Sequence, residues 1–358
     1  MKLSGRERLL HALHHMEGDC VPIFEFLYSR PFYKEVLGYE PTVYDAESIV
    51  KCSVKVGYDF VIIPMGGVSG FSAKEDSGNV YTDEWGITYK KDPSTWPIDA
   101  IIDYPVQDGS DWRRFKMPDP SLPERYHGVR TALSLRKEHK MGVIGNVRGP
   151  FSASWMLFGM DTFMYLMFDE PETVDEVLTS LTDFAIAGGL KMKDEGVDAI
   201  LFSDDYGSIT QPLMSPAQFK RFIVPQISRL CTAFRKANIP IIMHSDGNIQ
   251  PLLEDCVNSG IQGLHPMERG TDMDIAKIKK LYGDRLCLFG NVDNKNLLTR
   301  GTPAEVEEQV KEILRVAAPG GGHCLGSDHS IHDDIPNENV FAIYDAGRKY
   351  GCYPIKPV

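Results

Sequence analysis

Eight short apolar runs are spread along the whole chain, and each is too short and too apolar for a surface helix. The runs are residues 21–26, 60–65, 141–147, 199–205, 239–247, 260–266, 285–293 and 322–329. Strands that are apolar along their entire length are typical of parallel sheets, because helices cover both faces of such sheets. The chain therefore contains eight candidate parallel strands.

Helical patterns with recognisable starts lie between these runs. Residues 215–238 begin with Ser215 as an N-cap before a proline, and residues 302–317 repeat the device with Thr302. A strand followed by a helix, many times over, implies parallel pairing. No glycine-rich dinucleotide fingerprint follows the first strand, so we expect an α/β fold of the closed (β/α)8 (TIM) barrel type, not an open doubly wound sheet. We expect one such domain over residues 1–358.

Residues 68–123 interrupt the alternation of strands and helices. They are rich in Gly, Pro, Asp and Trp, and the alternating pattern around Glu84, Trp85 and Gly86 predicts a hairpin. We interpret this stretch as an insertion after the second strand. In a barrel, such an insertion emerges where the strands end and covers the mouth.

Charge and composition exclude several classes of function. The chain has 38 Lys and Arg against 50 Asp and Glu, a formal charge of −12, and no basic run compensates locally. Binding to nucleic acid or to an anionic membrane needs a positive field, so we expect neither. No segment of roughly 18 consecutive apolar residues occurs. Seven scattered cysteines without a Cys-x-x-Cys pair fit a reducing cytoplasm, where most would be buried thiols.

Polar side chains follow the apolar runs, and a barrel carries its chemistry where its strands end. These residues are Glu25, Asp204, Asp205, Tyr206, His244, Ser245, Asp246, His265, Glu268, Asn291, Asp293, Asp328 and His329. Structural roles are open for some of them. Asp246 and Asp293 each precede a helical pattern and could act as N-caps, and His265, which precedes Pro266, could be a packed, hydrogen-bonded histidine.

The His244-Ser245-Asp246 segment is the sharpest indication of a metal site. Residues two apart in an extended segment project to the same side, so both side chains can reach one ion. His329, after the last strand, is the expected third ligand. A set without thiolate is harder than a structural zinc site, and an open fourth position is typical of catalytic metal ions.

Several longer motifs carry a family resemblance. At HSDGNIQPLL, GLHPMERG, LFGNVD and HSIHDDIPNENV, and also at RERLLHALHHMEGDCVPI and SDDYGSITQPLMSPAQFKRFIVPQ, the sequence resembles the uroporphyrinogen decarboxylase superfamily. The resemblance extends along nearly the whole chain. It implies a (β/α)8 barrel, in agreement with the number of apolar runs.

The superfamily has a decarboxylase branch and a corrinoid-linked methyltransferase branch. The decarboxylases bind a substrate with eight carboxylates and carry an arginine-bearing R-Q-A-G-R-Y segment after the first strand. At this place the chain has PIFEFLYSRPFY. Both arginine positions are lost, Arg30 is only near them, and Glu25 adds a negative charge. The methyltransferases hold zinc by His-x-Cys and a later Cys, near the positions of His244, Asp246 and His329. Only the histidine matches. The two departures leave a more Lewis-acidic ion suited to an oxygen substrate, or else mean that the metal is absent.

The resemblance implies a methyltransferase that passes a methyl group from an O-methyl donor, such as a methoxylated aromatic, to the cobalt of a corrinoid. The chain has no Asp-x-His-x-x-Gly cobalamin-ligand motif, so the cobalamin must arrive on a separate corrinoid protein. In this scheme Zn²⁺ or another divalent ion polarises the ether oxygen, and Asp204 or Asp205 orients the substrate or relays a proton. We expect Glu25, Tyr206, His265 and Asn291 to contact the substrate. The rivals are a metal-free decarboxylase and a non-catalytic binding module on an inherited barrel.

Overall fold

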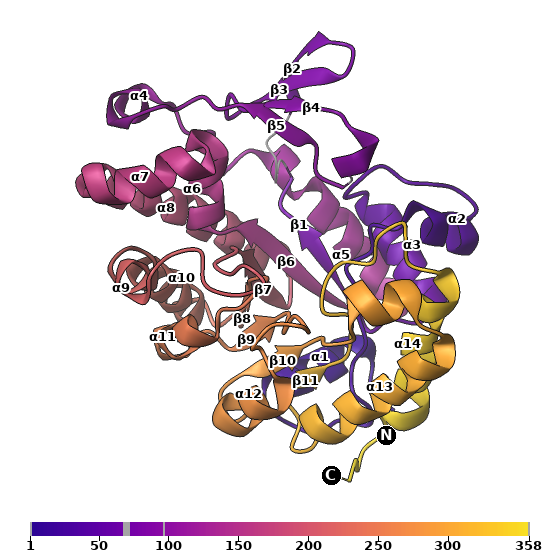
Figure 1. Ribbon diagram of the computed structural model, residues 1–358. Coiled ribbons are helices and arrows are strands. Elements are labelled where there is room, and N and C mark those ends of the chain that lie inside the picture. The colour runs from indigo at the N-terminus through magenta and orange to yellow at the C-terminus, as the bar shows by residue number, and fades with distance from the viewer. Residues whose placement is uncertain (1, 67–71, 96, 357–358) are drawn as a thin grey trace.

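A curled sheet of seven parallel strands forms the centre of the protein. The computed structural model describes residues 2–66, 72–95 and 97–356. The strand order is β1-β6-β7-β8-β9-β10-β11, and every neighbouring pair is parallel (Figure 1). The strands are β1 Phe60–Pro64, β6 Gly142–Arg148, β7 Ala199–Ser203, β8 Ile241–His244, β9 Gly263–His265, β10 Cys287–Phe289 and β11 His323–Cys324. Seven of the eight apolar runs thus contain strands, most of which end earlier than the runs do.

The first apolar run, residues 21–26, was wrongly predicted as a strand. It pairs with the end of the sheet only through isolated parallel bridges, Ile23 to Leu325 and Leu27 to Ile331. On its other side the Ile23 carbonyl accepts a hydrogen bond from the Asp59 amide just before β1. The Ile23 amide, however, donates to the Asp59 carboxylate, so a side chain occupies a position that a strand ladder would need. The segment therefore lies between the two end strands without being a regular strand.

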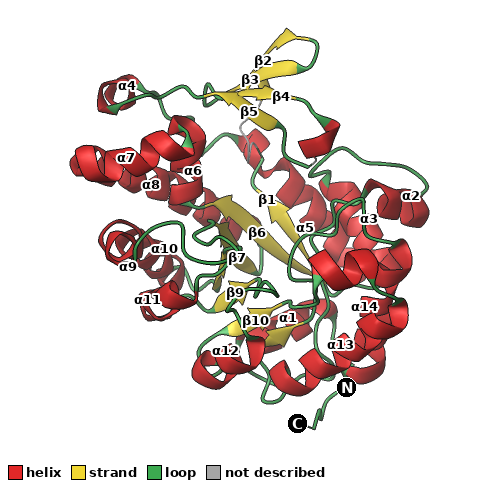
Figure 2. Cartoon of the chain, in the orientation of Figure 1, coloured by secondary structure: helices red, strands yellow, loops and turns green. Residues whose placement is uncertain are grey.

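Helices surround the curled sheet on its outer face (Figure 2). The helices are α1 Gly5–Leu13, α2 Arg30–Leu37, α3 Ala46–Val56, α4 Gly109–Arg114, η2 Pro123–Tyr126, α5 His127–His139, α6 Pro150–Phe158, α7 Met160–Asp169, α8 Pro171–Glu195, α9 Pro216–Gln218, η3 Phe219–Ile223, α10 Val224–Lys236, η4 Gln250–Leu252, α11 Leu253–Ser259, α12 Ile275–Tyr282, η5 Asn294–Leu298, α13 Pro303–Ala317 and α14 Asn337–Tyr350. Within the described ranges, no helix has both the length and the apolar character that crossing a membrane requires.

The two predicted helix starts are confirmed. Ser215 and Thr302 each accept a hydrogen bond from the backbone of the third helical residue, and each forms a capping box. The helix expected over 215–238 is divided, because a π-helical turn, η3, separates α9 from α10. Pro225 lies at the start of α10 and has no N–H to donate to the preceding turn, which explains the interruption.

The insertion after β1 forms a separate antiparallel sheet, in the order β2-β3-β4-β5. Its strands are β2 Ser72–Ser77, β3 Val80–Asp83, β4 Thr88–Lys90 and β5 Ala100–Asp103, with the 3-10 turn η1 Pro93–Thr95 before the last. The predicted hairpin is β3–β4, in which Tyr81 pairs with Tyr89. Residues 68–71 and 96 of the predicted insertion lie outside the described residues. Ile87 and Val106 share one hydrophobic cluster with the helices around the central sheet, so the insertion packs against the rest of the protein.

A second hydrophobic cluster fills the inside of the curled sheet. Its members are Leu9, Ala12, Leu13, Phe24, Phe60, Ile62, Ile144, Ala199, Leu201, Ile242, Cys287, Phe289 and Cys324. Most of them come from alternate positions of the central strands, as expected where one face of each strand points inward. Leu9 and Leu13 of α1 close the end at which the strands begin, since a Cβ on Gly142 would lie 2.7 Å from Leu9. The interior is therefore packed, and access remains where the strands end.

Five of the seven cysteines are buried, as the sequence indicated, and two are not. Cys20 is partly exposed and Cys352 is exposed, and their Sγ atoms lie 2.8 Å apart across an isolated antiparallel bridge. This pair joins the start of the chain to its end, which lie close together in Figure 1.

Candidate active site

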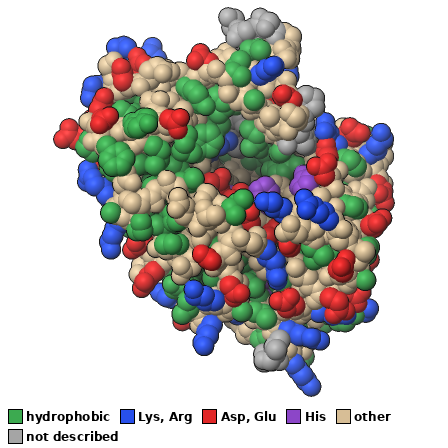
Figure 3. Space-filling model, in the orientation of Figure 1, with side chains coloured by type: hydrophobic (Ala, Val, Ile, Leu, Met, Phe, Trp, Pro, Cys, Tyr) green, Lys and Arg blue, Asp and Glu red, His purple; other side chains and the backbone are tan. Residues whose placement is uncertain are grey.

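A cavity of about 530 Å³ opens where the central strands end. Its volume lies within the range typical of small-molecule sites, roughly 300–1,000 Å³. Figure 3 shows the hollow in the middle of the molecule, with histidine side chains at its edge. The described residues of its lining include Glu25, Phe26, Tyr28, Tyr44, Ile98, Ile101, Tyr104, Asn146, Arg148, Ser152, Trp155, Met156, Ser203, Asp205, His244, Asp246 and His329. An open cavity of this size disfavours the reading as a non-catalytic module with a collapsed pocket.

The walls of this cavity are largely apolar and aromatic. Ile98 and Tyr104 come from the insertion, Tyr28 and Tyr44 from the segments around α2, and Trp155 from α6. The insertion therefore contributes to the mouth, as its position in the sequence predicted. Among the described residues of the lining, Arg148 is the single Lys or Arg, whereas Asp and Glu occur several times. Such a site suits a substrate with little negative charge.

Asp205, His244 and Asp246 form an acid–imidazole cluster in the lining. One potential ligand atom from each residue lies within 4.8 Å of those of the other two. His244 Nε2 is 3.6 Å from Asp205 Oδ1 and 3.7 Å from Asp246 Oδ2. Burial raises the pKa of Asp205, and the charge of His244 opposes that rise. Imidazole nitrogen and carboxylate oxygen are ligands that zinc and other divalent ions accept.

The loops after β7 and β8 bring the two aspartates together through glycine. Gly247 has φ +75°, and a Cβ on it would lie 2.5 Å from the backbone of Gly207, so the two loops touch backbone to backbone. The Asp246 amide then donates to Asp205 Oδ1 at 3.1 Å. His244 is the last residue of β8, which fixes the third member of the cluster.

Asp246 is half-buried beside His244 and His329 and does not cap a helix. The helical turn η4 begins only at Gln250, so the alternative role as an N-cap is not observed, whereas Asp293 does cap η5. Burial by itself raises the pKa of Asp246, but the charges of His244 and His329 outweigh it and lower this pKa. Its Oδ1 atom is buried and has no hydrogen-bond partner. A buried carboxylate oxygen without a partner is costly, and a bound cation would satisfy it.

His329, the expected third ligand, lines the same cavity and contacts Asp246. Its Nε2 is 3.1 Å from Asp246 Oδ2, and its side chain is 49% exposed. The hydrogen bond with Asp246 raises the pKa of His329 to about 9, although burial opposes the rise. The structure therefore gathers Asp205 with His244 and Asp246, and it places His329 as a partner of Asp246.

Asp204 and Tyr206 are near the cluster in sequence but do not line the cavity. Asp204 is fully buried, and its carboxylate accepts hydrogen bonds from the Phe151 and Ser152 amides, at 3.1 and 2.5 Å, where α6 begins. The Tyr206 hydroxyl donates to the same carboxylate at 2.7 Å. Burial raises the pKa of Asp204 to about 7. These contacts hold α6 against the end of β7.

His265 and Asn291 are also buried and lie outside the lining of the cavity. His265 is 1% exposed, and its Nδ1 lies 2.6 Å from Nδ1 of His244, so the packed, hydrogen-bonded histidine is the observed role. The Asn291 side chain donates to the Met267 carbonyl at 2.5 Å. Their expected contact with substrate stays a prediction that this arrangement does not support.

Glu25 lines the cavity and ties the segment after residue 21 to the end of the sheet. It is 6% exposed, and its carboxylate oxygens lie 2.9 Å from the Ser327 amide and 2.5 Å from the Ser327 hydroxyl. Burial raises the pKa of Glu25 from 4.5 to about 8. A substrate therefore meets this side chain at neutral pH mainly as a neutral acid.

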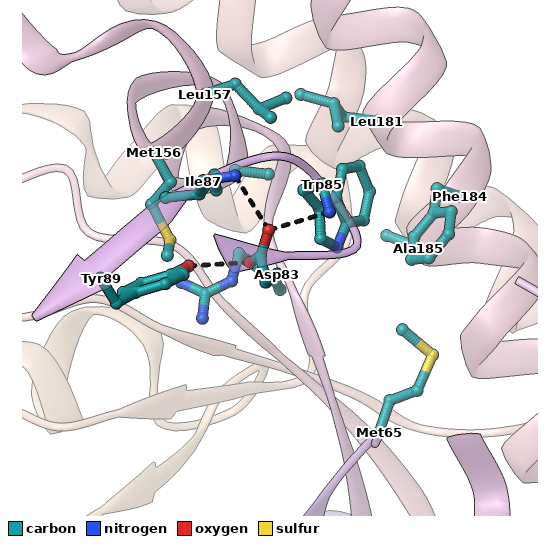
Figure 4. Close-up of a pocket in the computed structure, with 12 residues that line it drawn as sticks. Met65, Asp83, Trp85, Ile87, Tyr89, Met156, Leu157, Leu181, Phe184 and Ala185 are labelled. Atoms are coloured by element: carbon teal, nitrogen blue, oxygen red, sulfur yellow. Dashed lines mark hydrogen bonds between the residues drawn. The ribbon is translucent and has the colours of Figure 1, made fainter. Parts of the chain in front are cut away.

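A second, smaller cavity of about 40 Å³ lies between the β3–β4 hairpin and helices α6 and α8 (Figure 4). Trp85, Met156, Leu181 and Phe184 point into it from these elements. Asp83 accepts hydrogen bonds from the Trp85 and Ile87 amides and from the Tyr89 hydroxyl. Because these donors satisfy the carboxylate, we interpret the small cavity as packing space behind the insertion.

Sequence reasoning did not single out Arg148 as a lining residue or Asp205 as a possible metal ligand. Arg148 is the last residue of β6 and belongs to no polar cluster that the sequence would single out. Asp205 was expected as a catalytic group. Its position after β7, the strand next to β8, was the signal that could have added it to the metal ligands.

Comparison with known proteins identifies the family. A model described as "Uroporphyrinogen decarboxylase (URO-D)" matches residues 86–350. A uroporphyrinogen decarboxylase of Coxiella burnetii is 26% identical over 290 residues, covering 77% of this chain and 76% of that protein. Methylcobamide:CoM methyltransferase MtaA of Methanosarcina barkeri is 28% identical over 208 residues, 58% of each chain.

A solved structure supports the fold. A methyltransferase from Methanosarcina mazei superposes with a TM-score of 0.77 at 22% identity, over 98% of this chain and 99% of that one. The relatives include proteins named for each of the two branches that the sequence motifs suggested. Because the family model covers well over half of its length, the chain belongs to the uroporphyrinogen decarboxylase family.

Proposed function

We propose that this protein is a corrinoid-dependent methyltransferase that takes a methyl group from an O-methyl donor, such as a methoxylated aromatic. The observation that carries the proposal is the acid–imidazole cluster in the cavity, in which the Oδ1 atom of Asp246 is buried without a partner. The similarity to MtaA of Methanosarcina barkeri supports the same branch. We further propose that residues 21–27 act as the eighth element that closes the barrel.

Asp205, His244 and Asp246 would hold a divalent ion, with Zn²⁺ as the first candidate. The donor set fits, because two carboxylates and one imidazole supply hard and borderline ligands and their atoms already converge within 4.8 Å. When bound, the ion supplies Lewis acidity to the ether oxygen of the donor. His329 contacts Asp246 Oδ2, the oxygen that also faces His244, and would help to orient this carboxylate.

The aromatic walls of the cavity position the donor. Tyr28, Tyr44, Tyr104 and Trp155 offer flat apolar surfaces that suit an aromatic ring and exclude water around the methoxy group. Glu25, neutral at pH 7 because burial raises its pKa to about 8, would add no negative charge next to the donor. The partner is a separate corrinoid protein whose cobalt receives the methyl group at the cavity mouth.

The test combines metal analysis with a methylation assay. The purified protein is incubated with a reduced corrinoid protein and a panel of methoxylated aromatics, and the cobalt spectrum reports methylation. We expect a stoichiometric divalent ion and a methylation that His244→Ala abolishes. His14→Ala, which changes an exposed histidine at the end of α1, is the matched control and should keep the parent rate. A His244→Ala variant that methylates at the parent rate would refute the metal assignment.

Decarboxylation is the second candidate, because the uroporphyrinogen decarboxylase of Coxiella burnetii matches a larger share of the chain than MtaA does. A single arginine among the described lining residues is a poor match for a substrate with eight carboxylates. Incubation with uroporphyrinogen under reducing conditions separates the two candidates. Loss of carboxyl groups by the metal-free protein would establish the decarboxylase, and the absence of turnover favours methyl transfer.

A further inference from the structure

We propose that His265 is a positioning residue that fixes the proton of His244 on Nδ1 and thereby presents the Nε2 lone pair to a cation. The inference rests on the metal site of the proposed function and adds a buried residue outside the cavity to it. The contact that carries it is the 2.6 Å distance between the Nδ1 atoms of the two rings.

Strand pairing places the two histidines side by side. His244 ends β8 and His265 ends β9, and they are direct partners in the parallel register. Their rings stack with centroids 4.9 Å apart and planes 25° from parallel. The Phe26 ring meets both of them edge-on, at centroid distances of 5.9 and 5.0 Å. Both imidazoles are therefore held in orientation by packing as well as by their mutual contact.

A nitrogen–nitrogen hydrogen bond between two neutral imidazoles permits only two proton arrangements. In the first, His244 donates from Nδ1, so its Nε2 carries a lone pair, and His265 keeps its proton on Nε2. In the second, His265 donates from Nδ1, so His244 Nε2 carries a proton.

Only the first arrangement can bind a metal ion. His244 Nε2 faces Asp205 Oδ1 and Asp246 Oδ2, at 3.6 and 3.7 Å, so its lone pair would point at the ion that the three residues share. Without an ion, a proton on Nε2 lies between two carboxylates, and the second arrangement is favoured. Loading the site therefore requires the first arrangement, with the His244 proton on Nδ1.

Metal ligands of the imidazole type usually donate their second N–H to a carboxylate, a carbonyl or water. Here a second imidazole takes that place. Unlike a carbonyl or a carboxylate, it can reverse its role and donate, which satisfies His244 in the empty site as well. His265 thus supports the ligand in both states of the site.

Two substitutions separate the hydrogen bond from simple packing. His265→Leu fills a similar space without an acceptor, whereas His265→Asn offers an amide oxygen near the position of the lost Nδ1. Zn²⁺ alone is titrated by calorimetry into the metal-stripped full chain. We expect His265→Leu to weaken Zn²⁺ binding about 10- to 100-fold, the usual effect of removing such a partner, and His265→Asn to remain within about 3-fold of the parent protein.

The outcomes are distinct. Equal Zn²⁺ affinity of the parent and His265→Leu proteins overturns the inference. An equal loss of Zn²⁺ affinity in His265→Leu and His265→Asn also overturns it, because the effect would then come from packing. Nitrogen-15 spectra of histidine-labelled protein add a direct readout, in which His244 must carry its proton on Nδ1 and none on Nε2 once Zn²⁺ is bound. Tight Zn²⁺ binding without any methyl transfer would refute the proposed function and leave this inference standing, while a parent protein that binds no divalent ion would refute both.

Discussion

Replacing Glu25 by Gln should change how the stability of the protein depends on pH. Burial raises the pKa of Glu25 from 4.5 to about 8 in the native state. Between these two values the native side chain keeps its proton while the unfolded one has lost it. The native state then binds more protons than the unfolded state, so the free energy of unfolding falls as the pH rises through this window.

The hydrogen bonds around Ser327 support a protonated Glu25 independently. The Ser327 hydroxyl lies against both Glu25 Oε2 and the His329 carbonyl, but it has only one hydrogen to donate. A protonated Glu25 resolves this conflict, because it donates to Ser327 Oγ and leaves the hydroxyl hydrogen for His329. The amide of Gln can donate in the same way, so Glu25→Gln should preserve the local structure.

The magnitude follows from the two pKa values. At 1.36 kcal/mol per pKa unit, the difference corresponds to roughly 4 to 5 kcal/mol in total, of which about 3 kcal/mol is lost between pH 6 and pH 9. Urea unfolding followed by circular dichroism at pH 6, 7, 8 and 9 measures the free energy of unfolding of both proteins. We expect Glu25→Gln to gain about 3 kcal/mol relative to the parent protein over this range.

An exposed glutamate provides the control. The Glu138 side chain is 79% exposed, and Glu138→Gln should follow the parent protein at every pH. If the curves of the parent protein and Glu25→Gln stay parallel from pH 6 to pH 9, Glu25 is ionised throughout and the reasoning about its burial is wrong.

Three further substitutions test the contacts that hold the site. Asp204→Asn leaves one acceptor oxygen for the Phe151, Ser152 and Tyr206 donors, so urea unfolding should show a loss of about 2 kcal/mol; an unchanged midpoint would contradict this role. Gly149→Ala places a Cβ 2.2 Å from the Cβ of Asp204. It should lower the free energy of unfolding by roughly 1 to 3 kcal/mol, which a lower melting temperature would show. An unchanged melting temperature would mean that α6 can move away without cost. Glu84→Gln breaks the ion pair with the fully buried Arg125, whose guanidinium lies 2.6 and 2.7 Å from the Glu84 carboxylate. We expect the free energy of unfolding to fall by about 3 kcal/mol and proteolysis within residues 72–103 to be faster. Cleavage at the parent rate would argue against the pair as an anchor of the insertion.

Hydrophobic patterning predicted the parallel sheet because it records burial on both faces of a strand. The same signal failed at residues 21–26, which are equally apolar and equally buried. There the side chains of Asp59 and Glu25 take backbone hydrogen bonds, and no pattern of apolar residues reports such a replacement. Burial was predictable from the sequence, whereas the identity of the hydrogen-bond partners was not.

The candidate site shows the same limit. The order of strands placed Asp205, His244 and Asp246 at neighbouring strand ends, and proximity within the sheet follows from that order. The position of His329 depends on the loop after β11, which Asp328 fixes by accepting from the Arg269 and Asn294 amides. Those contacts join three separate loops, so the sequence, which grouped His329 with His244 and Asp246, could not show which atom His329 would contact.

The polar residues at the strand ends divide into two roles that alternate along the chain. Asp204, Ser245 and Asp328 turn toward neighbouring loops: Asp204 and Asp328 accept from backbone amides, and the Tyr206 amide donates to the Ser245 hydroxyl at 3.0 Å.

The residues adjacent to these three turn toward the cavity instead, and they are Asp205, His244, Asp246 and His329. An extended chain directs successive side chains to opposite sides, which explains the alternation. Substitutions in the first set should therefore change the free energy of unfolding, and substitutions in the second should change the binding of metal or substrate. Asp204 and Asp205, which the sequence offered as equivalent choices for one catalytic role, differ for this reason.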